Sequence, residues 1–346
     1  MTDHLPPHVE DAGIEDLALA AGRTDEREVR RRLFGFREAI SLVVPLALLG
    51  LFARNVDGAE AAATVGRASP FFVLLALAIY YLSFPVRAWR WALLLREGGA
   101  DVRGKQLLRI LLLGWFVNCL VPAKLGDLYR SYLVKRRFGI SLSRTVGVVV
   151  AERLLDVFAV FGLLAVGGTI AFGRTIVADL RLVYLAGAVL AVLISVGFVA
   201  IYAVAPRLAR YFPTNVRRVG RLFREGVLHS FRALPAAGPL TLIVWLCEAL
   251  RLYFVLAALG LDLPYSGVIF VAVASSLLTT VPLTPAGFGF VEIAIVYLLT
   301  SGFGLAQHDA VAVALLDRAV SVFSVIVVGG ILYARNAASE RIGATG

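Results

Sequence analysis

Residues 121–127 read VPAKLGD, and residues 281–289 read VPLTPAGFG. Each segment interrupts an apolar stretch, the first within 107–137 and the second within 265–303. Proline removes a helical hydrogen bond and glycine tolerates non-helical backbone, so each segment predicts a break between two short helices. The sequence therefore predicts two helical hairpins, with break residues Pro122, Gly126, Pro282, Pro285, Gly287 and Gly289.

The two hairpins belong to a weak internal duplication. Arg90 recurs as Arg251, 161 positions later, and Arg153 recurs as Arg318, 165 positions later. Other positions with nearly the same spacing are Ala88 and Ala249, Gly99 and Gly260, Asp101 and Asp262, Pro122 and Pro285, Gly126 and Gly289, Glu152 and Asp317, Phe158 and Phe323. Chance matching of apolar sequence is the alternative, but most of these residue types are rare in lipid. In a membrane chain, such a repeat is typical of a transporter.

Composition indicates a polytopic membrane protein. Of the 346 residues, 59% are hydrophobic and 17% are charged, and the mean hydropathy is +0.83. Apolar runs, most of them near the roughly 20 residues that a spanning helix needs, lie at 39–53, 70–95, 145–172, 181–205, 239–259 and 310–333. The polar N-terminal segment has no cleavable signal, so the first span is expected to act as the insertion signal.

Lysine and arginine set the expected orientation, because cytoplasmic loops carry an excess of both. Basic residues concentrate near the N-terminus, in 96–109, 130–144 and 207–232, and near the C-terminus. All these basic regions lie on the cytoplasmic side of the membrane if two segments do not cross it fully. Segment 107–137 must then enter and leave the membrane from the cytoplasm, and segment 265–303 must enter and leave it from outside. We therefore expect an all-α polytopic membrane protein with six full spans, two re-entrant hairpins, two inverted-topology repeats and cytoplasmic termini. Eight crossings with proline kinks are the alternative.

This topology divides the chain into six segments. They are a cytoplasmic mobile segment with an interfacial amphipathic helix (1–38), a first span with its outer loop (39–69), repeat 1 (70–172), a linking span with a basic cytoplasmic amphipathic loop (173–238), repeat 2 (239–333) and a cytoplasmic tail (334–346). Within 214–232, apolar residues and arginines fall largely on different helical faces. This pattern predicts an amphipathic helix that lies on the inner leaflet. The alternative is that its basic residues only set the orientation of the protein in the membrane.

Charged residues within the predicted spans and hairpins form the candidate site. A charge at the membrane centre costs about 2.5–3.5 kcal/mol, so it should face protein or water. The candidates for contact with a lipid headgroup or other substrate are Arg87, Arg90, Asn118, Lys124, Asp127, Arg130, Arg153, Arg251 and Arg318. The acids expected to balance these charges or couple an ion are Glu152, Asp156, Glu248, Glu292 and Asp317. Salt bridges without a substrate role are the alternative, and for Arg90, Arg153, Arg251 and Arg318 their recurrence in both repeats favours function.

The charged residues favour an anion over a metal or a nucleotide. The formal net charge is +10, and 31 of the 34 basic residues are arginine, whose planar group can donate two parallel hydrogen bonds to phosphate. The helix after each break would also direct its positive dipole end inward. No metal site or cofactor is expected, because the four histidines are far apart and both cysteines, Cys119 and Cys247, lie in apolar sequence. No nucleotide-binding loop is present.

The sequence resembles the lysylphosphatidylglycerol synthase transmembrane-region family, also described as flippase-like membrane proteins, over about residues 40–333. The shared motifs are RAWRW at 87–91, NCLVPAKLGD at 118–127 followed by Arg130, ERLLD at 152–156, and Pro282 to Glu292 followed by Arg318. The resemblance implies movement of a lipid, such as an aminoacylated phosphatidylglycerol, between leaflets. Other members are associated with polyprenol-linked glycans or hopanoid-type lipids. Larger members carry a soluble aminoacyl-transferase domain after the membrane region, and this sequence shows none, so lipid synthesis is not expected.

The leading hypothesis is a flippase or scramblase, not an enzyme, in the cell membrane. Its expected partners are membrane lipids, either phospholipid or polyprenyl phosphate, and a separate lipid-synthesising enzyme, with no nucleic acid. A transporter of a small soluble anion is one alternative. The other is a membrane enzyme acting on a lipid-linked donor, for which Glu152 and Asp156 are the only candidate pair of carboxylates.

Overall fold

The computed structural model describes residues 58–97, 102–121, 124–172, 211–280 and 284–343, with scattered positions between 185 and 208. These residues form helices and connecting turns, without a strand among them. The predicted span 39–53, most of the predicted span 181–205, the N-terminal residues 1–38 and the break residues Pro122 and Pro282 lie outside the described residues.

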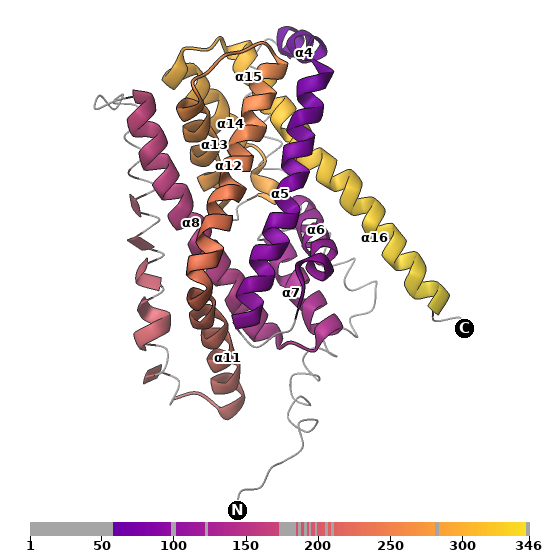
Figure 1. Ribbon diagram of the computed structural model, residues 1–346, viewed down its shortest axis with the longest axis vertical. Coiled ribbons are helices and arrows are strands. Elements are labelled where there is room, and N and C mark those ends of the chain that lie inside the picture. Colours follow the sequence, from indigo (N-terminus) through magenta and orange to yellow (C-terminus); the bar gives the residue numbers. More distant parts are fainter. Residues whose placement is uncertain are drawn as a thin grey trace, which may run out of the picture.

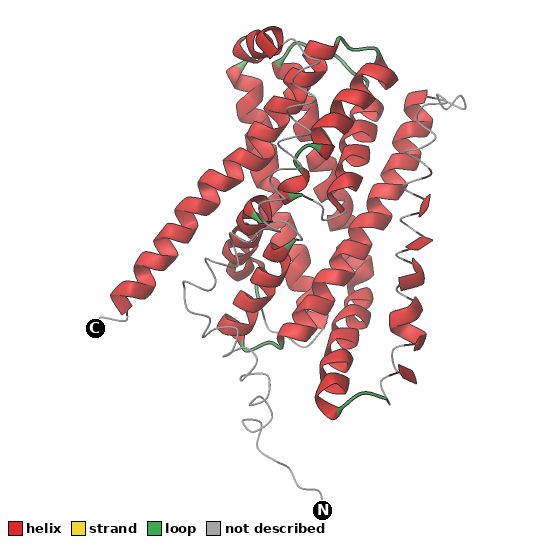
Figure 2. Ribbon diagram, turned by 180° about the vertical axis from the view of Figure 1, so that it is seen from behind, coloured by secondary structure: helices red, strands yellow, loops and turns green. Residues whose placement is uncertain are grey.

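The helices pack alongside one another, with short helices among the long ones (Figures 1 and 2). In chain order they are α4 (Gly58–Gly66), α5 (Pro70–Glu97), α6 (Gly104–Leu120), α7 (Leu125–Phe138), α8 (Leu142–Phe172), α11 (Thr214–Ser230), α12 (Leu234–Ala258), α13 (Tyr265–Thr280), α14 (Phe290–Tyr297), α15 (Gln307–Arg318) and α16 (Ser324–Gly343). One π-helical turn, Leu298–Gly302, follows α14, and another, Ala319–Phe323, joins α15 to α16.

Five described segments are long and apolar enough to cross a membrane: Pro70–Glu97, Leu142–Phe172, Thr214–Ala258, Pro285–Gly302 and Gln307–Arg335. Four of them contain most or all of a predicted span. The exception is Pro285–Gly302, which qualifies because its 18 residues are long and apolar enough. This segment forms the second half of the predicted hairpin 265–303. The fold is thus that of an all-helical, multi-pass membrane protein.

The first predicted hairpin consists of two short helices, and the second begins with one. The helices α6 and α7 contain 17 and 14 residues, and α13 contains 16. At 1.5 Å per residue these helices are about 21–26 Å long, less than the roughly 30 Å of bilayer hydrocarbon. Figure 1 places α6 and α7 in the lower half of the molecule and α13 and α14 in the upper half.

The helix boundaries repeat with the spacing of the sequence duplication. Helix α13 begins 161 positions after α6, and α14 begins 165 positions after α7. The contacts repeat as well. Helix α13 packs against α8, and the equivalent pair is α6 and α16, because α6 corresponds to α13 and α16 lies in the segment that corresponds to α8. Figure 1 shows α5 starting beside α4 at one end and α12 starting beside α11 at the other, so α5 and α12 run in opposite directions. These two helices form the most extensive helix contact among the described residues.

Gly126 does not lie in the first break, as the sequence predicts, but in the first turn of α7. Its amide donates to the Asn118 side-chain oxygen over 2.8 Å. A Cβ atom at this position would lie 2.0 Å from the carbonyl oxygen of Gly114 on α6. The glycine is needed because two helix backbones cross closely here. In the second hairpin, Pro285, Gly287 and Gly289 do lie between α13 and α14.

The basic segment 214–232 forms α11 and a short 3-10 turn that leads into α12. Its face with Gly226 and Val227 is buried, and α11 packs along α8. An ion pair of 3.0 Å joins Arg144 of α8 to Glu225 of α11, and both side chains are about one-third exposed.

Candidate functional site

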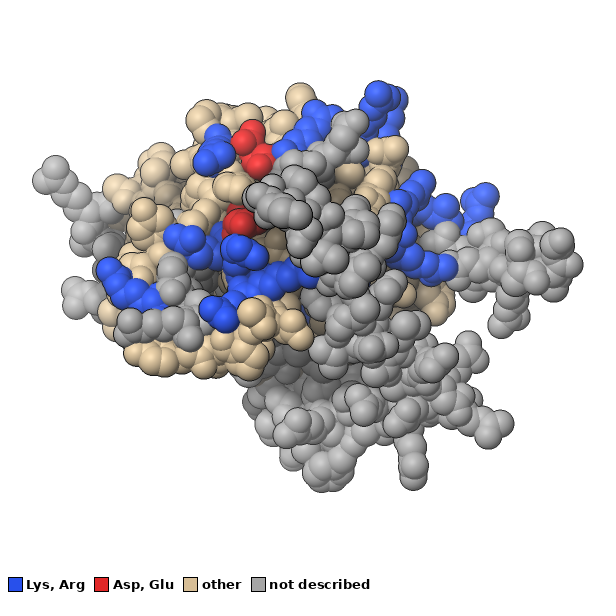
Figure 3. Space-filling view, turned by 90° about the horizontal axis from the view of Figure 1, so that it is seen from below, with Lys and Arg blue, Asp and Glu red and all other residues tan. Residues whose placement is uncertain are grey.

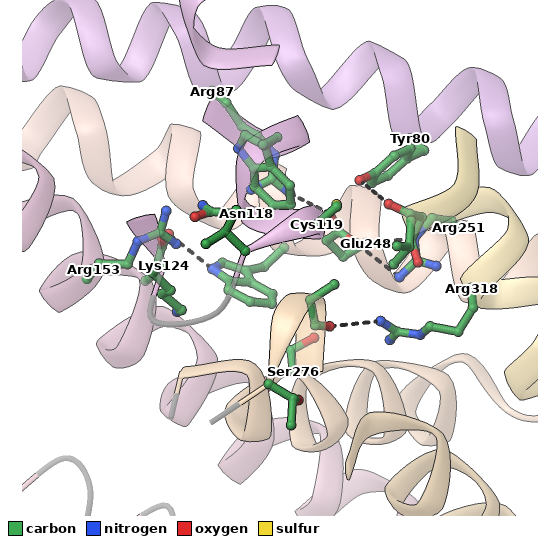
Figure 4. Close-up of a pocket in the computed structure, with 18 residues that line it drawn as sticks. Tyr80, Arg87, Asn118, Cys119, Lys124, Arg153, Glu248, Arg251, Ser276 and Arg318 are labelled. Carbon is green, nitrogen blue, oxygen red and sulfur yellow. Dashed lines mark hydrogen bonds and ion pairs between the residues drawn. The ribbon is translucent and has the colours of Figure 1, made fainter. Parts of the chain in front are cut away.

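A cavity of about 160 Å³ lies beside both helix breaks, and its wall includes Lys124 of the first and Ala286 of the second. Figure 4 shows Lys124 and Arg153 on one side of the cavity and Arg251 and Arg318 on the other. The charged wall residues are Arg87, Lys124, Arg153, Arg251, Arg318, Asp156 and Glu248. Five cations and two acids give the wall a formal charge of +3, which suits a negatively charged ligand.

Behind one side of the cavity, two buried arginines share the carboxylates of α8. Arg90 donates to Glu152 over 2.7 Å and to Asp156 over 2.6 Å. Arg130 donates to the second oxygen of Glu152 over 2.8 Å. Both arginine side chains are almost completely buried, at 0% and 1% exposure. Because buried charges are costly unless they are paired, these contacts hold α5, α7 and α8 together.

The first hairpin presents its polar groups at the edge of this cluster. Asp127 lies 3.4 Å from Arg153 and 3.3 Å from Arg130. Asn118 of α6 donates to Asp127 over 3.3 Å, which ties the two arms of the hairpin together. Arg153 retains 30% exposure and lines the cavity. Of the cations in this half, Arg153, Lys124 and Arg87 of α5 are the ones that reach the cavity.

The second half of the cluster has a similar arrangement. Arg251 pairs with Asp317 and, over 3.0 Å, with Glu248. Arg318 lies 3.5 Å from Glu292 and donates to the carbonyl of Ala286 at the second break over 3.4 Å. The Glu292 carboxylate also accepts a hydrogen bond of 2.7 Å from the backbone amide of Gly289, the residue just before α14.

Two ion pairs occupy equivalent positions in the two halves. Asp127 and Glu292 are each the third residue of the second hairpin helix, and each pairs with a matched arginine at 3.4–3.5 Å. The sequence alone suggests chemically unequal hairpin tips, because the acid of the second hairpin lies further along the chain. The 165-position offset from Asp127 to Glu292, the same as from Arg153 to Arg318, is the signal that identifies this equivalence.

The contact between Arg87 and Glu248 links the two halves. These residues are 161 positions apart, the same offset as Arg90 and Arg251, so opposite charges occupy equivalent positions on α5 and α12. The Arg87 guanidinium also lies 4.8 Å from the ring centre of Trp115.

All fourteen candidate residues gather around the cavity, but not all of them reach it. Eight line it: Arg87, Asn118, Lys124, Arg153, Asp156, Glu248, Arg251 and Arg318. The others stand behind these residues: Arg90, Asp127, Arg130, Glu152, Glu292 and Asp317. Arg90 and Arg130, expected among the headgroup ligands, thus lie in the supporting layer because carboxylates enclose their guanidinium groups.

Sequence reasoning missed the wall residues Tyr80, Trp245 and Ser321, and it missed Thr241, which stands behind the wall. Tyr80 donates to the carbonyl of Ser321 over 2.8 Å, and Trp245 donates to Asp156 over 3.3 Å. Arg90 donates to Thr241 over 3.0 Å, while the Arg251 guanidinium lies 5.6 Å from the Tyr80 ring centre. Tyr80 and Thr241 are 161 positions apart, so the duplication could have marked them although their residue types differ.

The donor set of the cavity does not resemble a metal site. Among the described residues, no group of three or more histidine, cysteine, aspartate or glutamate side chains could hold a metal ion. The described acids of the cluster are engaged with arginines. What this arrangement can do is bind an anion among guanidinium, ammonium and amide donors.

Comparison with known proteins agrees with this description. A family model, the lysylphosphatidylglycerol synthase TM region, matches residues 39–329. A UPF0104 membrane protein of Methanocaldococcus jannaschii is 33% identical over 63% of this chain and 93% of its own length. One from Methanothermobacter thermautotrophicus is 26% identical over 88% of this chain and 97% of its own length.

A further relative carries an enzyme name. The protein named glycosyltransferase AglD, from Haloferax volcanii, is 28% identical over 88% of this chain but only 54% of its own length. No solved structure matches the chain. With a family model that covers most of its length, the chain belongs to the lysylphosphatidylglycerol synthase TM region family.

Proposed function

We propose that this protein moves a lipid with a phosphate-bearing or otherwise anionic headgroup between membrane leaflets. The observation that carries the proposal is the cationic cavity, whose wall holds five cations and two acids in a multi-pass helical protein. The family membership agrees with a lipid-related role. Candidate cargoes are aminoacylated phosphatidylglycerol, another phospholipid or a polyprenyl phosphate, and a separate enzyme would supply the lipid.

The dimensions of the cavity favour a headgroup over a whole lipid. Pockets that enclose a drug-sized ligand usually measure about 300–1,000 Å³, whereas this cavity measures about 160 Å³. In our proposal the phosphate enters the cavity and the acyl or prenyl chains stay in the bilayer. The headgroup then avoids crossing hydrocarbon without polar partners.

We infer two inverted repeats, each with a re-entrant hairpin, as the frame for this movement. The opposite directions of α5 and α12 and the short hairpin helices support this topology. Figure 3 views the lower end of the molecule, where lysine and arginine outnumber acids on the visible surface. Exposed basic residues lie on α7 and α11 and just before α6, and they include Arg137, Arg217 and Arg103. From the positive-inside rule we infer that this end is cytoplasmic. We propose that both termini lie on this side and that the membrane is the cell membrane.

Cysteine labelling tests the topology. In a background without Cys119 and Cys247, we expect Arg103→Cys and Arg137→Cys, which flank the first hairpin, to react with an impermeant maleimide from the cytoplasmic side only. We expect Asp262→Cys and Ala306→Cys, which flank the second hairpin, to react from the outside only. Labelling of Arg103→Cys and Arg137→Cys from opposite sides would show that 107–137 crosses the membrane fully.

Leaflet exchange in proteoliposomes tests the function. We expect Arg153→Gln and Arg318→Gln to slow the exchange of headgroup-labelled lipids about 10- to 100-fold, because each removes a charged hydrogen-bond donor from the cavity wall. The matched control is Arg144→Gln, which alters an ion pair away from the cavity and should exchange lipid at the native rate. If the native protein exchanges neither phospholipids nor polyprenyl phosphates, the proposal is wrong.

The alternative to a lipid flippase is a membrane enzyme, because one relative is named a glycosyltransferase. Such an enzyme would need carboxylates free to act on a substrate. Glu152 instead accepts from both Arg90 and Arg130, and Asp156 accepts from Arg90 and Trp245. The contacts of Glu152 and Asp156 therefore fit a role in balancing the buried arginine charges better than a role in catalysis.

A further inference from the structure

The charged cluster has one more cation than it has acids. Among the described residues, its cations are Arg87, Arg90, Lys124, Arg130, Arg153, Arg251 and Arg318. Its acids are Asp127, Glu152, Asp156, Glu248, Glu292 and Asp317. Each of the six arginines lies within 4 Å of at least one of these carboxylates. The formal charge of the cluster is therefore +1.

Lys124 is the cation that accounts for this excess. It lines the cavity, and its ammonium forms no ion pair with any carboxylate among the described residues. Neighbouring Asp127 is already shared between Arg130 and Arg153. Lys124 is half-buried, and a cation that is partly shielded from water without an acid partner is costly, so the site is suited to an anion that Lys124 can contact.

The backbone at Lys124 supports a role for its side chain. Lys124 precedes α7 with φ 52° and ψ 36°, a left-handed conformation that disfavours residues with a Cβ atom. The residue that precedes α14 in the second hairpin is Gly289, with φ 85°, which glycine adopts without strain. A lysine where glycine would relieve strain is typical of a functional position.

We infer that the cavity selects a singly charged phosphodiester over a phosphomonoester or a diphosphate, and that Lys124 determines this selection. The inference rests on the proposed function and specifies its substrate class. One negative charge brings the cluster to zero, whereas two leave an unbalanced negative charge among buried carboxylates. Lys124 and Arg153 lie on the same side of the cavity in Figure 4 and would bind the phosphate together.

The duplication offers a matched way to change the charge. Ser321 lines the cavity and is 165 positions from Asp156, so Ser321→Asp places in the second half the acid that the first half already has. Lys124→Gly also brings the cluster to zero and relieves the backbone. Thr284→Lys adds a cation to the cavity wall and raises the cluster to +2.

The experiment compares two lipids with the same acyl chains at pH 7. Phosphatidylglycerol is a phosphodiester with one negative charge, and phosphatidic acid is a phosphomonoester with close to two, because the second phosphate pKa is about 6. We expect the native protein to exchange phosphatidylglycerol about tenfold faster or more. Lys124→Gly and Ser321→Asp should slow this exchange about tenfold or more, and Thr284→Lys should move the preference toward phosphatidic acid. The melting temperature of Lys124→Gly should equal or exceed the native value, which separates lost binding from lost folding.

The outcomes separate this inference from the proposed function. Equal exchange of the two lipids, or native exchange of phosphatidylglycerol by Lys124→Gly, would overturn the inference and leave the flippase proposal intact. If no lipid is exchanged, the flippase proposal fails. In that case the inference is tested by the melting temperature of the detergent-solubilised protein with each lipid, because a bound ligand stabilises the folded protein. A larger rise with phosphatidylglycerol than with phosphatidic acid supports the inference, and an equal rise contradicts it. Uptake of soluble glycerophosphoglycerol without lipid exchange would support the phosphodiester class and reject the lipid source.

Discussion

Replacing Arg90 with methionine is expected to lower the free energy of unfolding by about 3–5 kcal/mol, the usual cost of breaking a buried ion pair. The Arg90 side chain has 0% exposure and pairs with Glu152 and Asp156, whose side chains are 3% and 7% exposed. Its removal leaves Glu152 with Arg130 alone and deprives Asp156 of its shortest ion pair. Methionine keeps much of the side-chain length, so the loss of charge dominates the effect.

Denaturant titration or thermal unfolding in detergent measures this effect. Arg144→Met is the matched control, because Arg144 also pairs with a glutamate, Glu225, but both side chains are about one-third exposed. Exposed pairs contribute about 0–1 kcal/mol, so the control should stay close to the native stability. A similar loss in both variants would mean that the buried cluster adds nothing beyond an ordinary surface ion pair.

Exchanging Gly126 for alanine is expected to have the second large effect. The added Cβ atom would lie 2.0 Å from the Gly114 carbonyl oxygen and 2.6 Å from the Asn118 side-chain oxygen. A backbone atom cannot rotate away as a flexible side chain can, so α7 must move off α6. We expect a loss of about 3 kcal/mol or more, as overpacking against backbone gives the upper end of the usual range. Lipid exchange should fall as well, because Lys124 and Asp127 flank this position.

The control for this substitution is Gly162→Ala on α8. A Cβ atom at Gly162 would meet nothing within 4 Å. Alanine is a better helix former than glycine by about 1 kcal/mol, so the control should keep or slightly raise stability. Native stability and native exchange in Gly126→Ala would show that α6 and α7 do not need this close crossing.

Both predictions indicate that the fold and the cavity depend on the same contacts. The supporting layer with Arg90 and Arg130 joins α5, α7 and α8, and the outer layer with Lys124 and Arg153 faces the cavity. Substitutions in the supporting layer should therefore lower stability, whereas Lys124→Gly should slow lipid exchange without lowering stability. Measuring both quantities for each variant distinguishes the two layers.

Local sequence determined the helical hairpins, the duplication and the set of candidate charges. Proline and glycine are concentrated at the two breaks, so the helices of both hairpins begin and end within a few residues of the predicted ranges. Single prolines such as Pro85 and Pro239 leave α5 and α12 continuous. Charges are rare in apolar spans, so Glu152, Asp156 and their arginine neighbours could be selected without knowledge of their contacts. The spacing of the duplication pointed to the equivalence of distant positions, although residue matching alone missed Asp127 with Glu292 and Tyr80 with Thr241.

Only the tertiary structure decided which charges face the cavity and which stand behind it. Arg90 meets Glu152 across 62 positions and Arg87 meets Glu248 across 161, and helical periodicity carries no information about such contacts. The role of Gly126 depends on how closely α7 crosses α6, and the excess charge at Lys124 depends on which carboxylates the arginines already occupy. Packing of segments far apart in the chain settles these points, because side-chain partners depend on distance in space and not on distance along the sequence.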